Sequence, residues 1–238
     1  MIRLIIAILM SAILAVAVKT GLREYDKTTD SYIRNRIVLL HSERGGCTGI
    51  QIKAPSGKVF ILTAAHCYAI TDLGSVDAKS EDGTTAKVHV VDVDPVHDLM
   101  LLTSNSKLSI EVASKVALYD AVHTLTHGSM YPSYRTDGEM LEEREFRIPL
   151  FDVATADDED RCKSQSNQRV IIDVMSMSMI CEVKFMEMVS TAAVVPGSSG
   201  GPALDRMGRL IGIVSIHAGE GFSGLVPLHD IQEFLKKR

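Results

Sequence analysis

Three short segments of the sequence carry side chains that together could perform nucleophilic catalysis: LTAAHC (62–67), HDLMLL (97–102) and PGSSGGP (196–202). His66 follows a strand-like run, and an imidazole has a pKa that suits a general base near neutral pH. Asp98 precedes an apolar run, so we expect its carboxylate at the entrance of a buried strand, where it needs a donor such as an imidazole N–H. Ser199 lies among glycines, which permit a sharp turn that exposes a hydroxyl. These residue types predict a base, a carboxylate that orients it and a serine nucleophile.

The glycines around Ser199 also indicate a second role for this segment. A turn at Gly197 would aim the backbone N–H groups of Gly197 and Ser199 at one point, where they could bind an oxyanion. Taken separately, the three segments have ordinary explanations, namely a surface turn, a structural histidine and a turn or capping aspartate. Their combination is what favours chemistry.

The residues between these segments indicate a protein built mainly of β-strands. Short apolar or alternating runs rich in β-branched residues recur along the chain, and turn residues separate them. They cover residues 33–40, 48–53, 58–62, 87–93, 99–103, 169–175, 177–188 and 209–216. A closing helix is expected over 229–237, where Ile231, Phe234 and Leu235 recur at helical spacing. Many strands without intervening helices predict a β-barrel or a β-sandwich.

The composition limits the kinds of partner. The chain has 238 residues, a formal net charge of −5 and 46% hydrophobic residues, which fits one large all-β domain or two small ones. No basic face is implied, so we do not expect nucleic acid as a partner. The histidines form no convincing ligand cluster and no C-x-x-C pair occurs, so we expect neither a metal ion nor another cofactor.

Two further segments have an unusual composition. Residues 128–168 are rich in acidic side chains, and we expect a solvated insertion or, alternatively, a surface that selects basic partners. Methionines alternate over residues 175–179, as soft copper ligands could. The alternation continues through Cys181 to Phe185, so we interpret it as the core-facing side of a strand.

Residues 1–18 are expected to be a signal peptide or a membrane anchor. An apolar run begins at Leu4 behind a positive charge, and its length is typical of a signal peptide and short for a membrane span of about 20 residues. Ala15 and Ala17 form an A-x-A pattern for cleavage; a buried element of the domain is a third alternative. Residues 19–32 are expected to be a polar linker. Export or membrane tethering would suit the four cysteines, which allow three pairings.

With these residues in place, the chain resembles the trypsin-like serine proteases of the chymotrypsin fold. The order His66, Asp98, Ser199 is that of this lineage and differs from the orders of subtilisins and α/β-hydrolases. The segment STAAVVPGSSGGPAL (190–204) and the residues from GRLIGIVSI onward resemble the HtrA (Deg) protease domains in particular. The likeness covers roughly residues 33–237.

This resemblance implies two antiparallel β-barrels, about 33–112 and 113–238, and a short C-terminal helix. It also implies peptide-bond hydrolysis through an acyl-enzyme, with His66, Asp98 and Ser199 as catalytic residues. The N–H groups of Gly197 and Ser199 would form the oxyanion hole. The primary pocket that it implies is lined by Ala193, Val194, Val195, Ser215, Ile216 and His217.

The implied pocket predicts the cleavage preference. Ala193 stands where trypsin carries its pocket aspartate, so we do not expect cleavage after Arg or Lys. The lining is apolar and His217 would narrow the entrance, so we expect small or medium aliphatic side chains such as Ala, Val or Leu. Recognition of an acidic side chain by His217 is the alternative.

Other positions imply differences from digestive proteases. Ser198 replaces the aspartate that pairs with a newly freed N-terminus there, so we expect no activation by such a cleavage. No PDZ domain follows the last helix in this sequence, so we expect no regulation through one. The resemblance implies a disulfide between Cys47 and Cys67, which leaves Cys162 and Cys181 as a second bridge or as two buried thiols.

We therefore expect an exported or membrane-tethered serine endopeptidase that acts on proteins or peptides. The alternatives are a catalytically silent member of the fold that acts as a binding or chaperone-like module, and an esterase with the same three residues. The N-terminal segment makes membrane association possible, and the sequence makes no prediction of oligomeric state.

Overall fold

Strands make up most of the structure, a computed structural model that describes residues 30–238 except 129–130, 153, 164–167, 174–177 and 219–220. The strands of the first half of the chain are β1 (Ile37–Ser42), β2 (Gly45–Lys53), β3 (Val59–Ala64), β4 (Ser75–Ser80), β5 (Thr85–Asp94) and β6 (Leu99–Thr103). Those of the second half are β7 (Ala121–Gly128), β8 (Tyr131–Asp152), β9 (Gln168–Asp173), β10 (Ser178–Ser190), β11 (Pro202–Leu204), β12 (Leu210–His217) and β13 (Ser223–Pro227). The helices are the 3-10 helix η1 (Ala65–Ile70), α2 (Ala156–Lys163) and α3 (Leu228–Lys236), and residues 30–34 are also helical.

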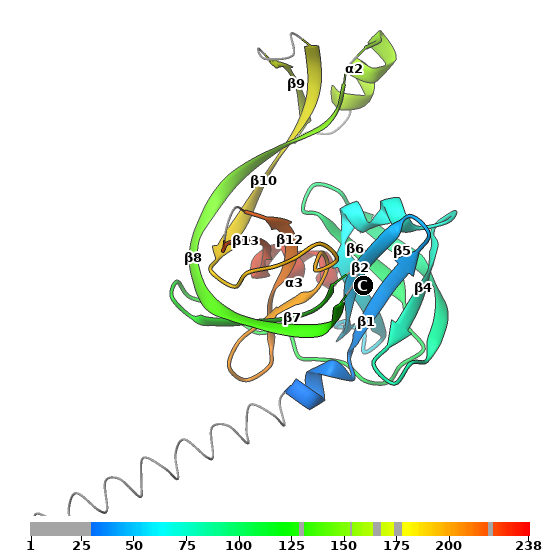
Figure 1. Cartoon of the computed structure of the whole chain (residues 1–238), viewed down its shortest axis with the longest axis vertical. Coiled ribbons are helices and arrows are strands. Elements are labelled where there is room, and N and C mark those ends of the chain that lie inside the picture. Colours follow the sequence, from blue (N-terminus) through cyan, green and yellow to red (C-terminus); the bar gives the residue numbers. More distant parts are fainter. Residues whose placement is uncertain (1–29, 129–130, 153, 164–167, 174–177, 219–220) are drawn as a thin grey trace, which may run out of the picture.

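Strands β1 to β6 close into an antiparallel barrel in the order β1-β2-β3-β6-β5-β4 (Figure 1). The apolar run at the start of β6 packs on two sides, inside the barrel and against the rest of the molecule. Met100 and Leu102 pack in the interior of the barrel, while Leu99 and Leu101 belong to the cluster between the barrels and α3. All four side chains are fully buried. Both faces of this strand are covered, and a continuous apolar run suits such a strand.

The second half of the chain forms a second barrel. Its strand order is β13-β12-β11-β7-β8-β10, and the pairing of β10 with β13 closes it. Strand β9 pairs with β10 outside this barrel. Val122, Met140 and Val214 are among the buried residues of its interior. The expectation of two antiparallel β-barrels is therefore confirmed.

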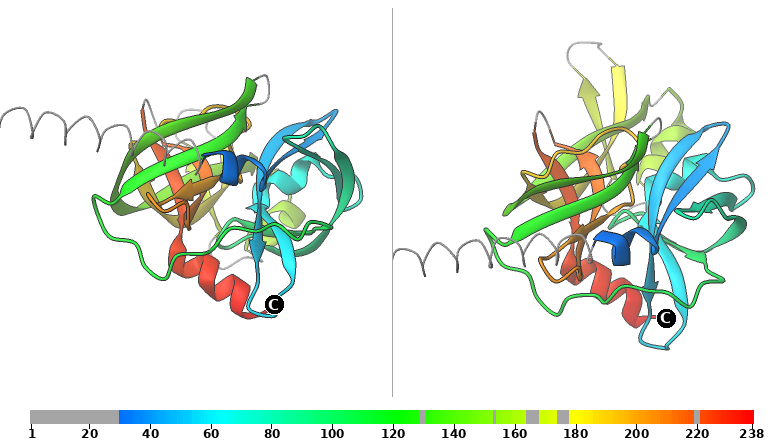
Figure 2. Two further views of the ribbon diagram at one scale, coloured as in Figure 1. Left: turned by 90° about the horizontal axis from the view of Figure 1, so that it is seen from below. Right: turned by 60° about the horizontal axis from the view of Figure 1, so that its bottom comes forward.

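Helix α3 joins the two barrels at one end. Its side chains Ile231, Phe234 and Leu235 are buried in a cluster that includes residues from strands of both barrels. Figure 2 shows α3 lying across the base of the molecule, with the C-terminus beside the first barrel. The short C-terminal helix expected over 229–237 is confirmed.

A long two-stranded arm, residues 145–185, rises from the second barrel and carries β9 and α2 at its tip (Figure 1). Strand β8 is 22 residues long, and its pairing with β10 runs from Met140 to Asp152. The pairing of β10 with β13 begins only at Met188. The outer parts of β8 and β10 therefore pair with each other beyond the barrel.

The segment 128–168, expected to be a solvated acidic insertion, lies mostly in β8 and α2. Charged side chains of β8 pair with one another across and along the strands. Glu145 forms ion pairs with Lys184 and Arg147, both at 2.6 Å. Backbone hydrogen bonds to the neighbouring strands make β8 a strand, although the side chains on its exposed face are polar.

The tip of the arm has a small core of its own. Cys162 of α2 and Cys181 of β10 form a disulfide and are fully buried against Val170. Met179, which the alternation places on the core-facing side, is 46% exposed, so that prediction is wrong for this residue. The tip core is too small to cover it. The methionines at 175 and 177 lie outside the described residues.

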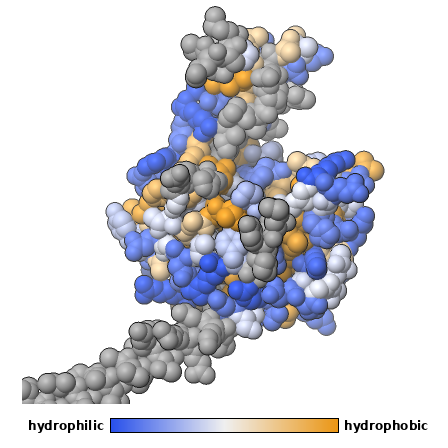
Figure 3. All heavy atoms as spheres, viewed as in Figure 1, coloured by the Kyte–Doolittle hydropathy of each residue, from blue (hydrophilic) through white to orange (hydrophobic). Residues whose placement is uncertain are grey.

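The surface of the barrels is mostly polar. Figure 3 shows hydrophilic residues over much of the described face, with apolar residues near the foot of the arm. In the part of the chain that the structure describes, no helix is both long and apolar enough to cross a membrane. The expected leader, 1–18, and most of the expected linker, 19–32, lie outside that part.

Candidate active site

His66 and Asp98 come together because they lie at the ends of neighbouring strands. Strand β3 ends at Ala64, just before His66, and it pairs with β6, which begins at Leu99, just after Asp98. The register pairs Ala64 with Leu99 and so places the two side chains next to each other. Asp98 Oδ2 lies 2.9 Å from His66 Nδ1, and Oδ1 accepts the backbone N–H of His66 at 2.9 Å.

The carboxylate of Asp98 is also fixed from the second barrel. The hydroxyl of Ser215, on β12, donates to Asp98 Oδ2 at 2.6 Å. The backbone of Asp98 has a left-handed conformation, with φ 52°, and its carbonyl accepts the N–H of Ala65 at 3.0 Å. Such a conformation is strained for a residue with a side chain and is common at functional sites.

The surroundings of His66 favour its protonated form. Burial lowers the pKa of His66, but the hydrogen bond and the negative charge of Asp98 raise it by more, so the pKa lies above the ordinary value of 6.5. The His66 side chain is 47% exposed, so solvent reaches the ring. An exposed imidazole held by a carboxylate at one nitrogen can exchange a proton at the other.

The loop that carries Ser199 is anchored to both barrels. The N–H of Thr48, on β2, donates to the Ser199 carbonyl at 2.8 Å, and the N–H of Gly200 donates to the Val214 carbonyl at 2.7 Å. Gly200 has φ 80°, and a Cβ there would lie 1.9 Å from Thr63 Oγ1 and 2.3 Å from the Thr48 carbonyl oxygen. This position therefore requires glycine.

The side chain of Ser199 reaches the other two candidate residues through Ser215. Ser199 Oγ donates to the backbone carbonyl of Ser215 at 3.4 Å, and the Ser215 hydroxyl bonds Asp98. Within the described part of the chain, no hydrogen bond joins Ser199 Oγ directly to His66. Hydrogen bonds between nucleophile and base are often loose before substrate binds, so this arrangement is compatible with catalysis.

Ser198 is held by neutral hydrogen bonds in place of an ion pair. It is 1% exposed, and its hydroxyl accepts from Thr126 Oγ1 at 3.1 Å and from the N–H of Val195 at 3.2 Å. The Tyr134 hydroxyl forms a short hydrogen bond with Ser198 Oγ and accepts the same N–H of Val195 at 3.0 Å. The loop before Ser199 is thus fixed by groups within the second barrel.

The two backbone N–H groups expected to bind an oxyanion are available. Gly197 has φ 95°, and Thr48 Oγ1 donates to its carbonyl at 2.9 Å, which fixes the direction of that peptide. Among the described residues, no acceptor is hydrogen-bonded to the N–H of Gly197 or of Ser199. Both residues are half-buried, so a bound group can supply the acceptor for these N–H groups.

The residues expected to line the primary pocket have different environments. Val194 is buried in the core cluster of the second barrel, whereas Ala193 and Val195 are exposed. Ser215 is buried and Ile216 is half-buried, and the side chain of His217 lies outside the described ones. Of the five described side chains, two are therefore exposed, one is half-buried and two are buried.

Sequence reasoning missed Glu187, which is 1% exposed on β10 and whose pKa is raised by burial and, in smaller part, by the charge of Asp98. The signal was present, because Glu187 continues the alternation of Cys181 and Phe185 and so falls on the inward face of the strand. It also missed Tyr134, for which the polar composition of the surrounding segment contains no signal.

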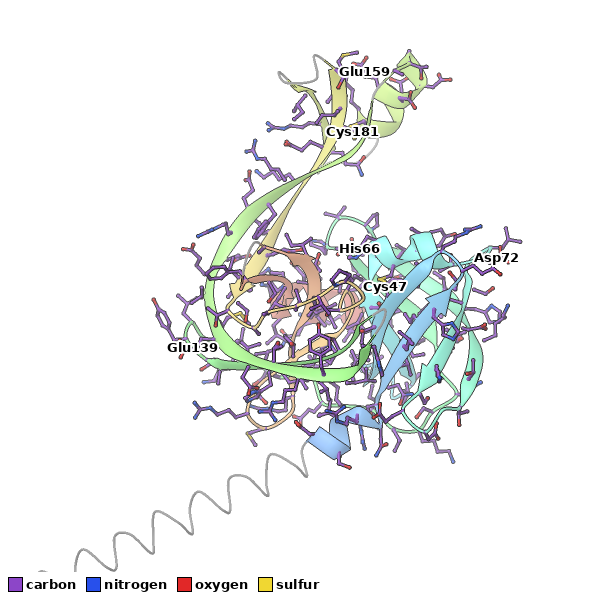
Figure 4. All side chains as sticks on the ribbon, in the orientation of Figure 1. Cys47, His66, Asp72, Glu139, Glu159 and Cys181 are labelled. Carbon is purple, nitrogen blue, oxygen red and sulfur yellow. A yellow bond between two sulfur atoms is a disulfide. The ribbon has the colours of Figure 1, made fainter. Side chains whose placement is uncertain are left out.

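Both disulfides have formed. Cys47 of β2 bonds Cys67 of η1, directly after His66, and Cys162 bonds Cys181 in the arm. The bridge expected between Cys47 and Cys67 and the second bridge are thus confirmed. Figure 4 shows Cys47 and His66 close to the junction of the barrels, on the side from which the arm rises. The first bridge ties the turn of His66 to β2.

The sequence as a whole identifies the family. Residues 27–228 match the family model described as Trypsin, which spans the strands of both barrels and the candidate site. The chain therefore belongs to the trypsin family, the class that the two barrels and the arrangement of His66, Asp98 and Ser199 define.

Within this class its relatives are of HtrA type. A serine protease Do-like HtrA of Bacillus subtilis is 26% identical over 196 residues, which are 80% of this chain and 38% of that protein. A serine protease HtrA-like of Staphylococcus epidermidis is 46% identical over 50 residues, which are 19% of this chain and 8% of that protein. The chain thus spans less than half the length of these relatives.

Solved structures share the fold at low identity. The active form of the Rv3671c protease from M. tuberculosis has a TM-score of 0.66 at 17% identity and covers 88% of this chain and 83% of that one. The HtrA-type protease AlgW with tripeptide has a TM-score of 0.60 at 16% identity and covers 88% of this chain and 63% of that one. These likenesses show the chymotrypsin-like fold.

Proposed function

We propose that this chain is a serine endopeptidase with Ser199 as nucleophile, His66 as general base and Asp98 as the residue that orients the imidazole. The observation that carries the proposal is the contact of the Asp98 carboxylate with His66 Nδ1 at 2.9 Å, in a chain of the trypsin family. That contact keeps the proton on Nδ1 and leaves Nε2 free to accept one.

The reaction would proceed in two halves. Ser199 Oγ turns from the Ser215 carbonyl to His66 Nε2 and attacks the carbonyl carbon of the scissile peptide, while its proton passes to His66. The C–N bond then breaks, and His66 gives this proton to the leaving amine, so that an ester with Ser199 remains. Water, activated by the same imidazole, hydrolyses the ester and restores the hydroxyl.

The oxyanion of each tetrahedral intermediate would accept the N–H groups of Gly197 and Ser199. Two observations support this role: no described residue accepts a hydrogen bond from either N–H group, and Thr48 Oγ1 donates to the Gly197 carbonyl. Removing one donor from an oxyanion hole typically slows turnover about 10²–10³-fold. The hydrogen bonds of Ser198 would hold the loop before Ser199 in the conformation that binds the oxyanion. In an activated digestive protease an ion pair has this role.

For the substrate we propose peptides with a small or medium aliphatic residue before the scissile bond. Ala193 adds no charge to the site, and Ile216 presents an apolar side chain beside Ser215. We also propose that the domain acts outside the cytosol, exported or tethered by its N-terminal segment. The two disulfides support an oxidising compartment.

A fluorophosphonate probe and a peptide library test the proposed activity. Parent protein should be labelled at Ser199 and should cleave peptides, and the Ser199→Ala variant should do neither. Labelling with hydrolysis of ester substrates alone would support an esterase. Folded parent that reacts no more than Ser199→Ala would overturn the proposal and favour a binding or chaperone-like module.

A further inference from the structure

Glu187 is a carboxyl group buried beside the candidate active site, and the mechanism above does not use it. It lies on β10, one residue before β10 begins to pair with β13, and it is 1% exposed. Among the described residues, no N–H or O–H group donates a hydrogen bond to either of its carboxyl oxygens, although the Ser215 hydroxyl lies close to them. Burial of an ionised carboxylate without donors is costly, so such a group takes up a proton instead.

The backbone of β13 makes room for this carboxyl group. A Cβ on Gly224 would lie 1.8 Å from Glu187 Oε2 and 2.6 Å from Ile216 Cγ1. Glycine at this position therefore leaves the space that the carboxyl group occupies, next to the β12 segment of Ser215 and Ile216. Glu187 is packed against the strand that supplies the hydrogen bond to Asp98.

Two carboxyl groups thus face one hydroxyl group. Ser215 has a single proton, and the 2.6 Å contact shows that it is given to Asp98 Oδ2. The oxygen of Ser215 can then only accept from Glu187. Asp98 is also paired with His66, whereas no described residue donates to Glu187, so Glu187 is the member of the pair that holds a proton.

We propose that Glu187 is a positioning residue that carries a proton: as a neutral carboxylic acid it donates to Ser215 Oγ and so keeps the Ser215 proton on Asp98. The proposal rests on the proposed function of His66, Asp98 and Ser199. Its consequence is that ionisation of Glu187 disables the site.

The charges around Glu187 agree with a neutral group. Burial raises the pKa of Glu187 to about 8, with a smaller lowering by the Ser215 hydroxyl and a further rise from the charge of Asp98. On β8 the residue paired with Glu187 is Arg144, but its side chain is 61% exposed and its guanidinium bonds Glu142. On β12 and β13 the residues against Glu187 are Ser215, Ile216 and Gly224, which carry no charge.

Ionised Glu187 would harm catalysis in two ways. It would compete for the Ser215 proton and so deprive Asp98 of a donor. It would also add a negative charge close to the site, which opposes the negative charge that develops on the substrate oxygen. Activity should therefore fall as pH rises through the pKa of Glu187.

The pH dependence of kcat/KM tests this role. A group with a pKa near 8 is about nine-tenths protonated at pH 7 and about one-tenth protonated at pH 9, so the parent should lose about tenfold in kcat/KM between these values. Glu187→Gln keeps the shape and a donor but cannot ionise, so it should show no loss of kcat/KM toward pH 9. Glu187→Leu serves as a second variant if Gln does not fold.

Glu182→Gln is the matched control. Glu182 is on the same strand and is 9% exposed, but it lies in the arm and pairs with Arg169 at 2.9 Å. This variant should lose activity at alkaline pH as the parent does. The same alkaline loss in Glu187→Gln as in the parent would overturn the proposal.

Infrared difference spectroscopy gives a readout without turnover. In the Ser199→Ala background, the parent should show the carbonyl band of a protonated carboxylic acid at pH 7, which disappears near pH 8 to 9 and is absent in Glu187→Gln. An ionised Glu187 at pH 7 would overturn the proposal. If no variant reacts with fluorophosphonate or cleaves peptides, the proposed function fails, and this measurement still decides whether Glu187 holds a proton.

Discussion

The carboxylate of Asp98 holds His66 at two points, through the backbone N–H at 2.9 Å and through Nδ1 at 2.9 Å. The first contact fixes the turn that carries the imidazole, and the second fixes the ring and its tautomer. Because Asp98 precedes β6 and His66 follows β3, the antiparallel pairing of these two strands is what creates both contacts.

Replacing Asp98 with Asn should slow the enzyme without unfolding it. The amide can still accept the His66 N–H but offers no charge, so kcat should fall by about 10⁴, as in other serine proteases. The pH midpoint of the activity loss on the acid side should also change. The parent should lose activity with a midpoint above 6.5, because the raised pKa of His66 keeps the base protonated there, and Asp98→Asn should lower this midpoint.

A pH–rate profile of kcat/KM for both proteins checks this prediction. Circular dichroism at each pH shows that the comparison is made on folded protein. An unchanged midpoint in Asp98→Asn would mean that the carboxylate does not control the His66 imidazole.

Gly200→Ala should prevent the loop of Ser199 from docking. The added Cβ would lie 1.9 Å from Thr63 Oγ1 and 2.3 Å from a backbone oxygen, at φ 80°. The conformation alone costs about 1–2 kcal/mol and overpacking typically about 1–3 kcal/mol more. Gly83→Ala is the matched control, because Gly83 has φ 85° with nothing within 4 Å of an added Cβ.

Urea unfolding of both variants in the Ser199→Ala background measures the difference. Gly83→Ala should lose only the conformational part of the free energy of unfolding. Equal losses in the two variants would show that the close approach of Gly200 to the first barrel is not required.

The hydrogen bonds of Ser198 should matter for turnover more than for substrate binding. Tyr134→Phe removes the hydroxyl that bonds both Ser198 Oγ and the Val195 N–H, and Ser198→Ala removes the acceptor of Thr126. Each should lower kcat about tenfold with little change in KM, because a displaced loop weakens only the oxyanion contacts.

The two changes act on one network, so their effects should not add. A double-mutant cycle on kcat tests this, with the double variant no more than a few-fold slower than either single one. Additive losses, or losses confined to KM, would argue against a shared role in holding the loop.

Much of the site could be predicted from sequence because its residues stand at strand ends. His66 and Asp98 flank apolar runs, and a run that is buried on both faces, as in β6, is easy to recognise. The glycine-rich segment before β11 likewise marks a turn whose shape only glycine permits at Gly200. Strand ends related Asp98 to His66, and the resemblance to trypsin-like proteases added Ser199.

The arm and the buried acid depend on contacts that are distant in sequence. Strand β8 is charged along its exposed face, and only its pairing with β7 and β10 makes it a strand. The space for Glu187 exists because Gly224, on another strand, has no side chain. Neither relationship has a signature within a short window of sequence.

The stability of Glu187→Gln relative to the parent should depend on pH. In the parent the pKa of Glu187 is raised from 4.5 in the reference state to about 8, so the unfolded chain releases this proton at lower pH than the folded one. The contribution of Glu187 is complete below the unfolded pKa and is lost as pH rises through the folded one, at about 1.4 kcal/mol per pH unit.

Thermal unfolding at pH 5 and at pH 9 checks this prediction in the Ser199→Ala background. The melting temperature of Glu187→Gln should rise relative to that of the parent as pH increases. A difference between the two proteins that is the same at both pH values would show that Glu187 is not buried with a raised pKa.

The most direct test of the central claim is the site of covalent labelling by a fluorophosphonate, read by peptide mass spectrometry together with peptide hydrolysis. The account predicts that the label is on Ser199, that His66→Ala and Ser199→Ala abolish both labelling and hydrolysis, and that both variants stay folded. Hydrolysis that survives Ser199→Ala, or a folded parent that is neither labelled nor active on any peptide, would contradict it.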